Sequence, residues 1–228
     1  MSSLDRHAGH LLRLTDVEGL SVLDVGCGNG AFVRTLASLG AQVVGVEIDA
    51  RKIAMAEARP RVASEQYAVG RGEDLPAAKG SADLIVYLFS LHHVPIISQA
   101  MAIEEATRAL RPGGRLHVVD PLPHGPATEV LLPIDDERET RTNAQNLMDS
   151  LDGQGWSLIA KSCYEIDRSY ADFDGLVEAM ISTDRARASG LESCREEVAE
   201  QFDRLAEWRG DRFWLSQPCV LFHLEREA

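Results

Sequence analysis

The chain has 228 residues, of which 45% are hydrophobic and 26% are charged, and this composition excludes a disordered or a fibrous protein. Asp and Glu outnumber Lys and Arg by 36 to 23, and the formal net charge of -13 repels a polyphosphate backbone, so nucleic acid is not an expected partner. The four cysteines lie far apart and form no CxxC pair, so we expect neither a disulfide framework nor a metal site.

Targeting signals are not apparent in the sequence. Residues 1–13 carry His and charged residues where a secretory signal needs an apolar run, and no stretch approaches the length of a membrane span. We therefore expect a cytoplasmic protein without a membrane partner, present as a monomer or a homodimer.

Strands and helices alternate through the first part of the chain. Short apolar or Val-rich runs predict strands at residues 21–25, 41–46, 84–89 and 116–119. Helical apolar spacing or good helix formers predict helices at residues 32–39, 50–58 and 97–110, the last marked by Ile97, Met101, Ala106 and Leu110. This alternation predicts parallel strands joined by right-handed crossovers, so residues 1–120 are expected to form a doubly wound α/β core with an N-terminal helix.

The alternation ends after Asp120. Residues 121–126 are predicted to be a proline-rich loop, and residues 135–141 are dense in charges of both signs. Regular structure is predicted again for a helix at 143–151, a strand at 156–166, helical apolar stripes at 173–180 and 198–208, and a strand at 220–224. We expect residues 121–228 to complete the sheet and to add a helical cap within one continuous domain.

A glycine-rich segment, DVGCGNG at residues 24–30, lies between the first predicted strand and its helix. Glycines at 26, 28 and 30 let backbone N–H groups approach an anionic group at the positive end of the helix. The same segment fits the loose pattern of dinucleotide-binding loops, and a tight turn that binds nothing is a further alternative.

Two carboxylates near this loop favour a particular ligand. Glu47 ends the second predicted strand, about 20 residues beyond the first glycine, where a carboxylate accepts both hydroxyls of a ribose; a solvated strand-end charge is the alternative. Asp24 stands where dinucleotide-binding loops usually have an apolar residue. A carboxylate there repels a pyrophosphate and attracts an ammonium, directly or through water, so Asp24 favours a zwitterion over a diphosphate.

Five segments in order resemble the class I S-adenosylmethionine-dependent methyltransferases, and most closely the small-molecule, type 11 group: VLDVGCGNG (22–30), GVEI (45–48), GEDLP (72–76), SLHHV (90–94) and LRPGG (110–114). The resemblance covers about the first 120 residues. It implies a Rossmann-like, mostly parallel seven-stranded sheet with an antiparallel C-terminal hairpin, and it leaves the extra helices of residues 167–211 as a helical insertion that acts as a cap over a small-molecule acceptor.

The resemblance also implies S-adenosylmethionine as the cofactor and S-adenosylhomocysteine as the product. In this family the glycine loop lines the methionine part, the residue at position 47 holds the ribose, the next residue packs on adenine, residues 73–74 lie at the adenine edge, and residue 88 offers backbone to the amino group. The expected cofactor-binding residues are therefore Asp24, Gly26, Cys27, Gly28, Gly30, Glu47, Ile48, Glu73, Asp74 and Leu88.

Methyl transfer from a sulfonium is an in-line displacement that depends mainly on alignment. If the acceptor is a hydroxyl or an ammonium, His92 or His93, just beyond the strand at 84–89, is the expected base; capping or packing of the following helix is the alternative for both. His124 and Asp120 are weaker candidates. For His124 the alternative is again capping or packing, and for Asp120 it is the capping of a turn.

Other features favour structural roles or rival functions. Arg138 and Arg141 are expected on a solvated charged face, with a bidentate clamp on an acidic acceptor as the alternative. Phe202 and Trp208 are expected in a core between cap and sheet, with substrate contact as the alternative. Two rival functions stay open, namely a nicotinamide-dependent oxidoreductase and a cofactor-binding accessory or regulatory module without catalysis.

Overall fold

The computed structural model describes residues 3–183, 185 and 187–227. The strands are β1 (Ser21–Val25), β2 (Gln42–Glu47), β3 (Gln66–Val69), β4 (Ala82–Leu88), β5 (Leu110–Pro121), β6 (Trp156–Tyr170), β7 (Glu207–Arg209) and β8 (Arg212–Arg226). The helices are α1 (Ser3–Leu12), α2 (Ala31–Ser38), α3 (Ala50–Glu57), η1 (Leu91–His93), α4 (Ile96–Ala109), α5 (Pro126–Leu131), α6 (Arg138–Ser150), α7 (Phe173–Thr183) and α8 (Arg187–Leu205).

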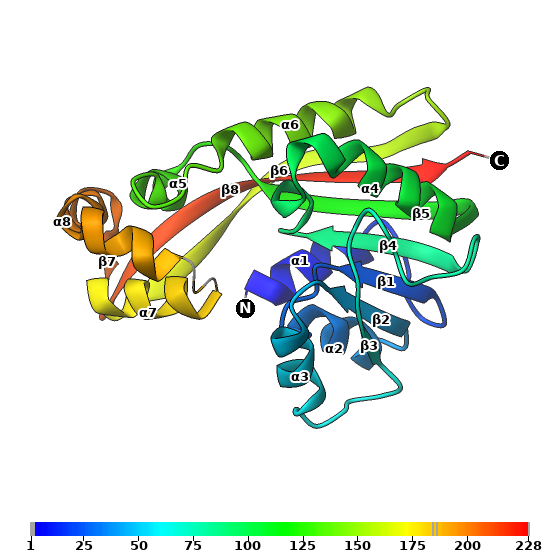
Figure 1. The fold of residues 1–228 in the computed structure, drawn as a ribbon, viewed down its shortest axis with the longest axis horizontal. Coiled ribbons are helices and arrows are strands. Elements are labelled where there is room, and N and C mark those ends of the chain that lie inside the picture. Colours follow the sequence, from blue (N-terminus) through cyan, green and yellow to red (C-terminus); the bar gives the residue numbers. More distant parts are fainter. Residues whose placement is uncertain (1–2, 184, 186, 228) are drawn as a thin grey trace. The chain divides into compact units, whose positions relative to one another are not determined.

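These strands form one sheet in the order β3-β2-β1-β4-β5-β8-β6, with β7 paired to β8 outside that path (Figure 1). The pairs β1–β2, β1–β4, β2–β3 and β4–β5 are parallel, and β7–β8 is antiparallel. The expected α/β fold, mostly parallel with antiparallel C-terminal strands, is confirmed. The short strand β7 adds to the seven strands that were expected.

The chain forms two compact units. The first unit comprises residues 1–120, 143–163 and 220–228, and the second comprises residues 121–142 and 164–219. Strands β6 and β8 and helix α6 each contribute residues to both units. The domain boundary expected after Asp120 stays a prediction, because compactness alone does not show that a unit folds by itself.

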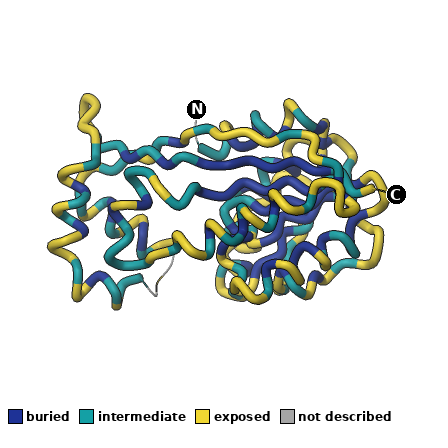
Figure 2. Tube along the Cα trace, turned by 90° about the horizontal axis from the view of Figure 1, so that it is seen from above, coloured by how far each residue is buried: buried dark blue, intermediate teal, exposed yellow. Residues whose placement is uncertain are grey.

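The sheet of the first unit explains why its central strands are apolar runs. β1 lies between β2 and β4, with Val22 opposite both Val43 and Leu84, so both of its edges are paired, and its last four residues are buried. Figure 2 shows long runs of buried residues along the strands. One apolar cluster joins α1, β1, α2, β2 and β4; its buried members include Leu11, Val22, Phe32, Val33, Leu36, Val43, Leu84 and Val86.

Two details of the first unit differ from expectation. β3 was not predicted, because its four residues are exposed or half-buried and form no apolar run. Helix α4 was predicted, but Ile97 and Met101 are 88% and 50% exposed, so they do not mark its buried face. That face is made instead by residues such as Ala102 and Ala106, whose small side chains let the helix pack closely.

The second unit has its own apolar core, which packs α5, α7 and α8 and includes Val130, Leu176, Met180, Val198 and Phe202. The two extra helices expected between residues 167 and 211 are confirmed as α7 and α8. Helix α5 was not predicted; it begins at Pro126, the last residue of the expected loop, and the first turn of a helix tolerates proline.

The prediction that Trp208 lies in the core is wrong. Trp208 is 56% exposed, whereas Phe202 is fully buried. Helix α8 ends at Leu205, and Trp208 lies in β7, so the helical spacing that linked the two aromatic residues does not extend to it.

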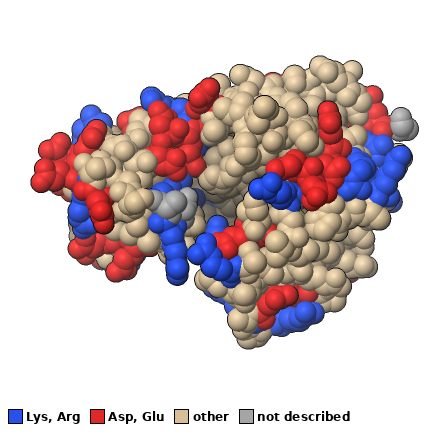
Figure 3. Space-filling model, in the orientation of Figure 1, with Lys and Arg blue, Asp and Glu red and all other residues tan. Residues whose placement is uncertain are grey.

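The surface carries charges of both signs. On the face seen in Figure 3, Lys and Arg side chains lie beside Asp and Glu side chains. Several of these charges pair, as in Arg111–Asp83 at 2.6 Å and Arg108–Glu105 at 2.8 Å. Among the helices that the structure describes, none has the length and apolar character needed to cross a bilayer.

Candidate functional site

The glycine loop follows β1 in the first unit. Gly26, Gly28 and Gly30 have φ of 76°, 56° and 74°, in the left-handed region that favours glycine. A Cβ on Gly26 would lie 2.4 Å from the Cβ of Ser90, and a Cβ on Gly30 would lie 2.5 Å from the ring of Tyr67. A Cβ on Gly28 would meet no described atom within 4 Å. Packing therefore requires two of these glycines, while the third borders open space.

Glu47, at the end of β2, is tied to this loop. Its side chain is buried, and Oε2 accepts the N–H of Gly28 at 2.9 Å while Oε1 accepts the N–H of Asp49 at 3.1 Å. Ile48 follows with an apolar side chain that is 58% exposed. The structure thus brings the carboxylate expected at a ribose next to the loop expected at a methionine moiety; both roles stay predictions.

Asp24 lies beneath the loop on β1 and is 2% exposed. Its Oδ2 has no hydrogen-bond partner within the described part of the chain. Burial, and then the charge of Glu47, raise the pKa of this carboxyl to about 7. A buried acceptor without a donor is unfavourable, so this position is suited to a ligand that supplies a cationic donor.

Cys27 is half-buried in the same loop, with Sγ 3.8 Å from the carbonyl oxygen of Gly28. Burial, followed by the charges of Asp24 and Glu47, raises the pKa of the thiol above its usual range. The thiol therefore stays protonated, which excludes a thiolate nucleophile at this position.

The remaining cofactor candidates lie at the carboxyl ends of β3 and β4. Glu73 is half-buried and lies 3.8 Å from Arg71, whose carbonyl accepts the N–H of Asp74 at 3.2 Å. Leu88 ends β4 and pairs with Val119 of β5. Parallel strands of an open α/β sheet present ligand sites at this edge, and Glu73, Asp74 and Leu88 lie there. Their expected roles, at the adenine edge and at the amino group of the cofactor, stay predictions.

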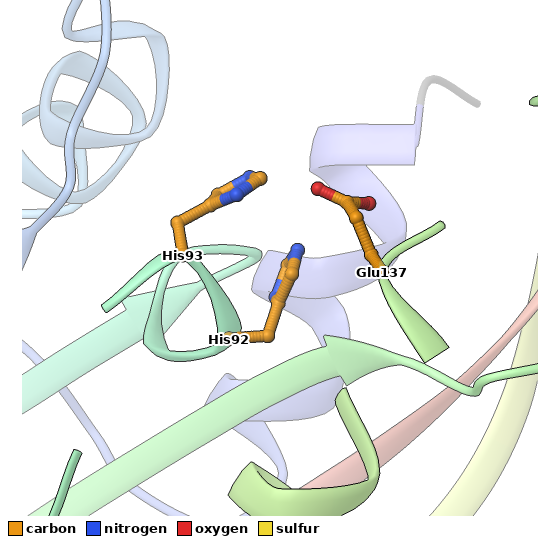
Figure 4. Close-up of side chains that lie close together, drawn as sticks. All are labelled: His92, His93 and Glu137. Carbon is orange, nitrogen blue, oxygen red and sulfur yellow. The ribbon is translucent and has the colours of Figure 1, made fainter. Parts of the chain in front are cut away.

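The histidine pair follows β4 on the short helix η1, and Figure 4 shows both imidazoles there. His92 is buried and His93 is exposed, and their ring centroids are 4.1 Å apart. His92 Nδ1 lies 2.7 Å from Oδ1 of Asp120, and the backbone N–H of His92 donates to Oδ2 of Asp120 at 3.2 Å. The structure thus gives Asp120 a role that its sequence position alone did not indicate.

Phe89, between Leu88 and the histidines, is the other residue that the sequence did not reveal. It is the non-glycine residue with positive φ, 55°, in the described backbone. Its N–H donates to the carbonyl of Val119 at 2.7 Å, and its ring meets the ring of His7 edge-on at 5.0 Å. Strained backbone of this kind costs about 1–3 kcal/mol and is concentrated at functional sites. No sequence signal identifies it.

The second unit contains a pocket of about 490 Å³, lined by residues of α5, α6, α8 and the loops on both sides of α5. Arg138 of α6, Arg204 of α8 and His124 of the loop before α5 are among them. Arg138 is exposed and pairs with Asp136 at 2.6 Å, as expected for a solvated charged face. That expectation is wrong for Arg141, which is buried and donates to Thr128 Oγ1 at 2.7 Å and Glu137 Oε2 at 2.5 Å. Arg141 therefore holds α6 to α5 within this unit.

Comparisons with known proteins agree with this architecture. Residues 23–118 match the family model described as a methyltransferase domain. The chain is 38% identical over 104 residues to a ubiquinone biosynthesis O-methyltransferase of Xanthomonas oryzae pv. oryzae, covering 44% of this chain and 43% of that protein. It is 31% identical over 154 residues to an uncharacterized methyltransferase of Synechocystis, covering 64% of this chain and 71% of that protein.

A solved structure extends the likeness of the fold to nearly the whole chain. A putative methyltransferase from Bacillus halodurans superposes with a TM-score of 0.65 at 18% identity, covering 99% of both chains. In contrast, the chain spans less than half the length of the ubiquinone biosynthesis relative that it matches. The family model spans residues 23–118, which contain the glycine loop and run from β1 into β5.

Proposed function

This chain belongs to the class I S-adenosylmethionine-dependent methyltransferases, and we propose that it moves a methyl group from that cofactor to a small-molecule acceptor. The name of the Xanthomonas relative, an O-methyltransferase of ubiquinone biosynthesis, supports a small-molecule acceptor. The observation that carries the proposal is the buried, unpartnered Oδ2 of Asp24 beneath a glycine loop that borders open space at Gly28.

The residues present fit the cofactor. Its ammonium would supply the cationic donor that Asp24 lacks, directly or through water, and backbone N–H groups at the start of α2 favour its carboxylate. Glu47 already accepts two N–H groups, and its carboxylate would accept the ribose hydroxyls. Ile48 offers an exposed apolar surface beside Glu47 for the adenine face.

The bound cofactor supplies a methyl group on a positively charged sulfur, which departs as a neutral thioether. The protein therefore needs no nucleophile of its own, in agreement with the protonated thiol of Cys27. Holding the acceptor atom in line with the methyl group contributes up to roughly 7–11 kcal/mol when alignment is good. The task of the chain is to bind, to align and, for a protonated acceptor, to remove a proton.

Ligand-induced shifts in melting temperature test the proposal. S-adenosylmethionine and S-adenosylhomocysteine should stabilise the folded chain by about 2.7 kcal/mol at a hundredfold excess over Kd, while NAD should not. Glu47→Ala should reduce the shift, and Glu57→Ala, on the exposed side of α3, is the matched control. No shift at millimolar adenosyl compound, or a shift with NAD alone, contradicts cofactor binding.

Turnover needs a separate measurement. Release of S-adenosylhomocysteine should appear when small-molecule acceptors are added to the chain and its cofactor. Tight binding combined with no release from any acceptor in a broad screen contradicts methyl transfer and leaves the accessory-module alternative.

A further inference from the structure

We propose that the Glu105–Arg108 ion pair of α4 positions residues 71–77, here called the base segment, and thereby sets how selectively the chain binds the purine base of its cofactor. This inference deepens the proposed function and rests on it. Glu105 and Arg108 would be positioning residues that act on the cofactor through the base segment. The pair and the base segment both lie within the first unit of the structure.

The base segment begins beside the carboxylate proposed for the ribose. Val69, the last residue of β3, lies opposite Glu47 in the parallel pairing of β2 and β3. The N–H of Gly70 then donates to the carbonyl oxygen of Glu47 at 3.1 Å. Because the base of a nucleoside is bonded directly to its ribose, a ribose held by Glu47 brings the base close to the residues that follow Gly70.

Backbone hydrogen bonds within the base segment are local. The N–H of Asp74 donates to the carbonyl of Arg71 at 3.2 Å, and the N–H of Ala77 donates to the carbonyl of Leu75 at 2.7 Å. The segment lies between β3 and β4, outside the helices and strands that the structure describes. Leu75 is nevertheless only 3% exposed, so its backbone groups need partners inside the protein.

The last turn of α4 supplies these partners. The N–H of Leu75 donates to Oε2 of Glu105 at 3.1 Å, and Nη2 of Arg108 donates to the carbonyl of Leu75 at 3.1 Å. Nη1 of Arg108 donates to the carbonyl of Ala77 at 2.8 Å. Two side chains of one helix therefore hold residues 75–77 of the base segment.

Glu105 and Arg108 also fix each other. They are three positions apart on α4 and so share one face of the helix. Nε of Arg108 donates to Oε1 of Glu105 at 2.8 Å, and Nη2 donates to Oε2 at 2.8 Å. The hydrogen-bonded guanidinium holds the pKa of Glu105 below its usual range, so the carboxylate stays charged. An ammonium at position 108 would lack the planar fork that serves this carboxylate and two carbonyls together.

The base segment carries carboxylates that can recognise the base. Glu73 is half-buried and Asp74 is exposed. A carboxylate only accepts hydrogen bonds, so when it is held at the edge of a base it favours an amino group there over a carbonyl. Adenine has an amino group at this edge, and hypoxanthine has a carbonyl. A base segment in a fixed conformation therefore selects the adenosyl group, whereas a loose segment must first be ordered and loses part of that selection.

Amide hydrogen exchange tests the holding of the base segment without any ligand. In the ligand-free wild-type chain the N–H of Leu75 should be protected, and in Arg108→Gln it should exchange at least about tenfold faster. Leu84 is the reference amide, because its strand is paired on both edges, and its exchange should not change. Unchanged exchange at Leu75, or an equal acceleration at both amides, overturns the holding role.

Calorimetry with two matched ligands tests the effect on the base. S-adenosylhomocysteine and S-inosylhomocysteine differ in the amino group or carbonyl of the base, and the wild-type chain should bind the first about 10–100-fold more tightly. Arg108→Gln and Arg108→Lys should weaken binding of S-adenosylhomocysteine by about tenfold and of S-inosylhomocysteine by less than about threefold. Arg111→Gln is the matched control, since Arg111 also pairs with a carboxylate, that of Asp83 at 2.6 Å, and it should keep both affinities.

The outcomes distinguish this inference from the proposed function. Equal weakening of both ligands in Arg108→Gln, or unchanged affinities, overturns the role of the pair in recognising the base. A wild-type chain that binds both ligands equally tightly overturns the selectivity of the base segment. A wild-type chain that binds neither ligand contradicts the proposed function instead, and the exchange experiment still decides whether the pair holds the base segment.

Discussion

Replacing Asp24 by Asn should change how the stability of the ligand-free chain depends on pH. The folded-state pKa of Asp24 is about 7, against an ordinary value of 3.8, because the carboxyl is fully buried beside Glu47. A carboxyl with a raised pKa contributes stability that is present below pH 3.8 and is lost as pH rises toward 7. At 1.36 kcal/mol per pKa unit, the loss between pH 5 and 8 is about 2–3 kcal/mol.

The variant removes this loss because an amide does not titrate. The Asn side chain still leaves a buried polar group unsatisfied, which costs about 1–3 kcal/mol, but that cost is the same at every pH and cancels from the comparison. The free energy of unfolding of Asp24→Asn, minus that of the wild-type chain, should therefore rise by about 2–3 kcal/mol from pH 5 to 8.

Urea unfolding at pH 5, 6.5 and 8, followed by the fluorescence of the three tryptophans, measures this difference. Glu104→Gln, which removes an exposed carboxylate from α4, is the control and should parallel the wild type. Saturating S-adenosylhomocysteine should reduce the wild-type loss, because its ammonium stabilises the charged carboxylate. Parallel curves for Asp24→Asn and the wild type refute the argument that Asp24 is an uncompensated buried acid.

Three other changes test different parts of the molecule. Phe202→Ala should cost about 3–5 kcal/mol in urea unfolding, and Trp208→Ala, at a side chain that is 56% exposed, clearly less; equal losses contradict the core assignment. Gly30→Ala should lower Tm, because its Cβ would lie 2.5 Å from the Tyr67 ring at φ 74°; an unchanged Tm contradicts that packing. Burial lowers the pKa of His223 to about 4, so its contribution to stability is present above pH 6.5 and is lost as pH falls toward 4. The neighbouring His117, whose pKa is also lowered by burial, adds to this loss, so His223→Gln should reduce the acid loss in urea unfolding without abolishing it; an unchanged loss contradicts the contribution of His223.

The candidate cofactor site was largely predictable because its determinants are local. The DVGCGNG loop needs positive φ at three glycines, and those positions are readable from the residue types alone. Glu47 ends a strand whose Val-rich run is apparent in the sequence, and the parallel pairing of β1 and β2 places that strand end beside the loop. The charge state of Asp24, in contrast, depends on burial that only packing decides.

The pairing of His92 with Asp120 was not predictable from spacing. The two residues are 28 positions apart, and their contact depends on β4 and β5 being neighbours in the sheet. The burial of Arg141 likewise depends on its contact with Thr128 of α5, a helix for which the sequence analysis made no prediction. The strained backbone of Phe89 is imposed by the contacts of its neighbours and leaves no trace in residue type.

The sequence by itself therefore determined the alternation of the strands and helices that apolar patterns mark, the glycine loop and the carboxylate at the end of the second predicted strand, because periodicity and backbone preference act over a few residues. Tertiary structure alone decided which strand ends meet, which charges lose their water and which residues hold strain. Those properties arise from contacts between segments far apart in the chain, where burial and pairing, and not residue type, set the free energy.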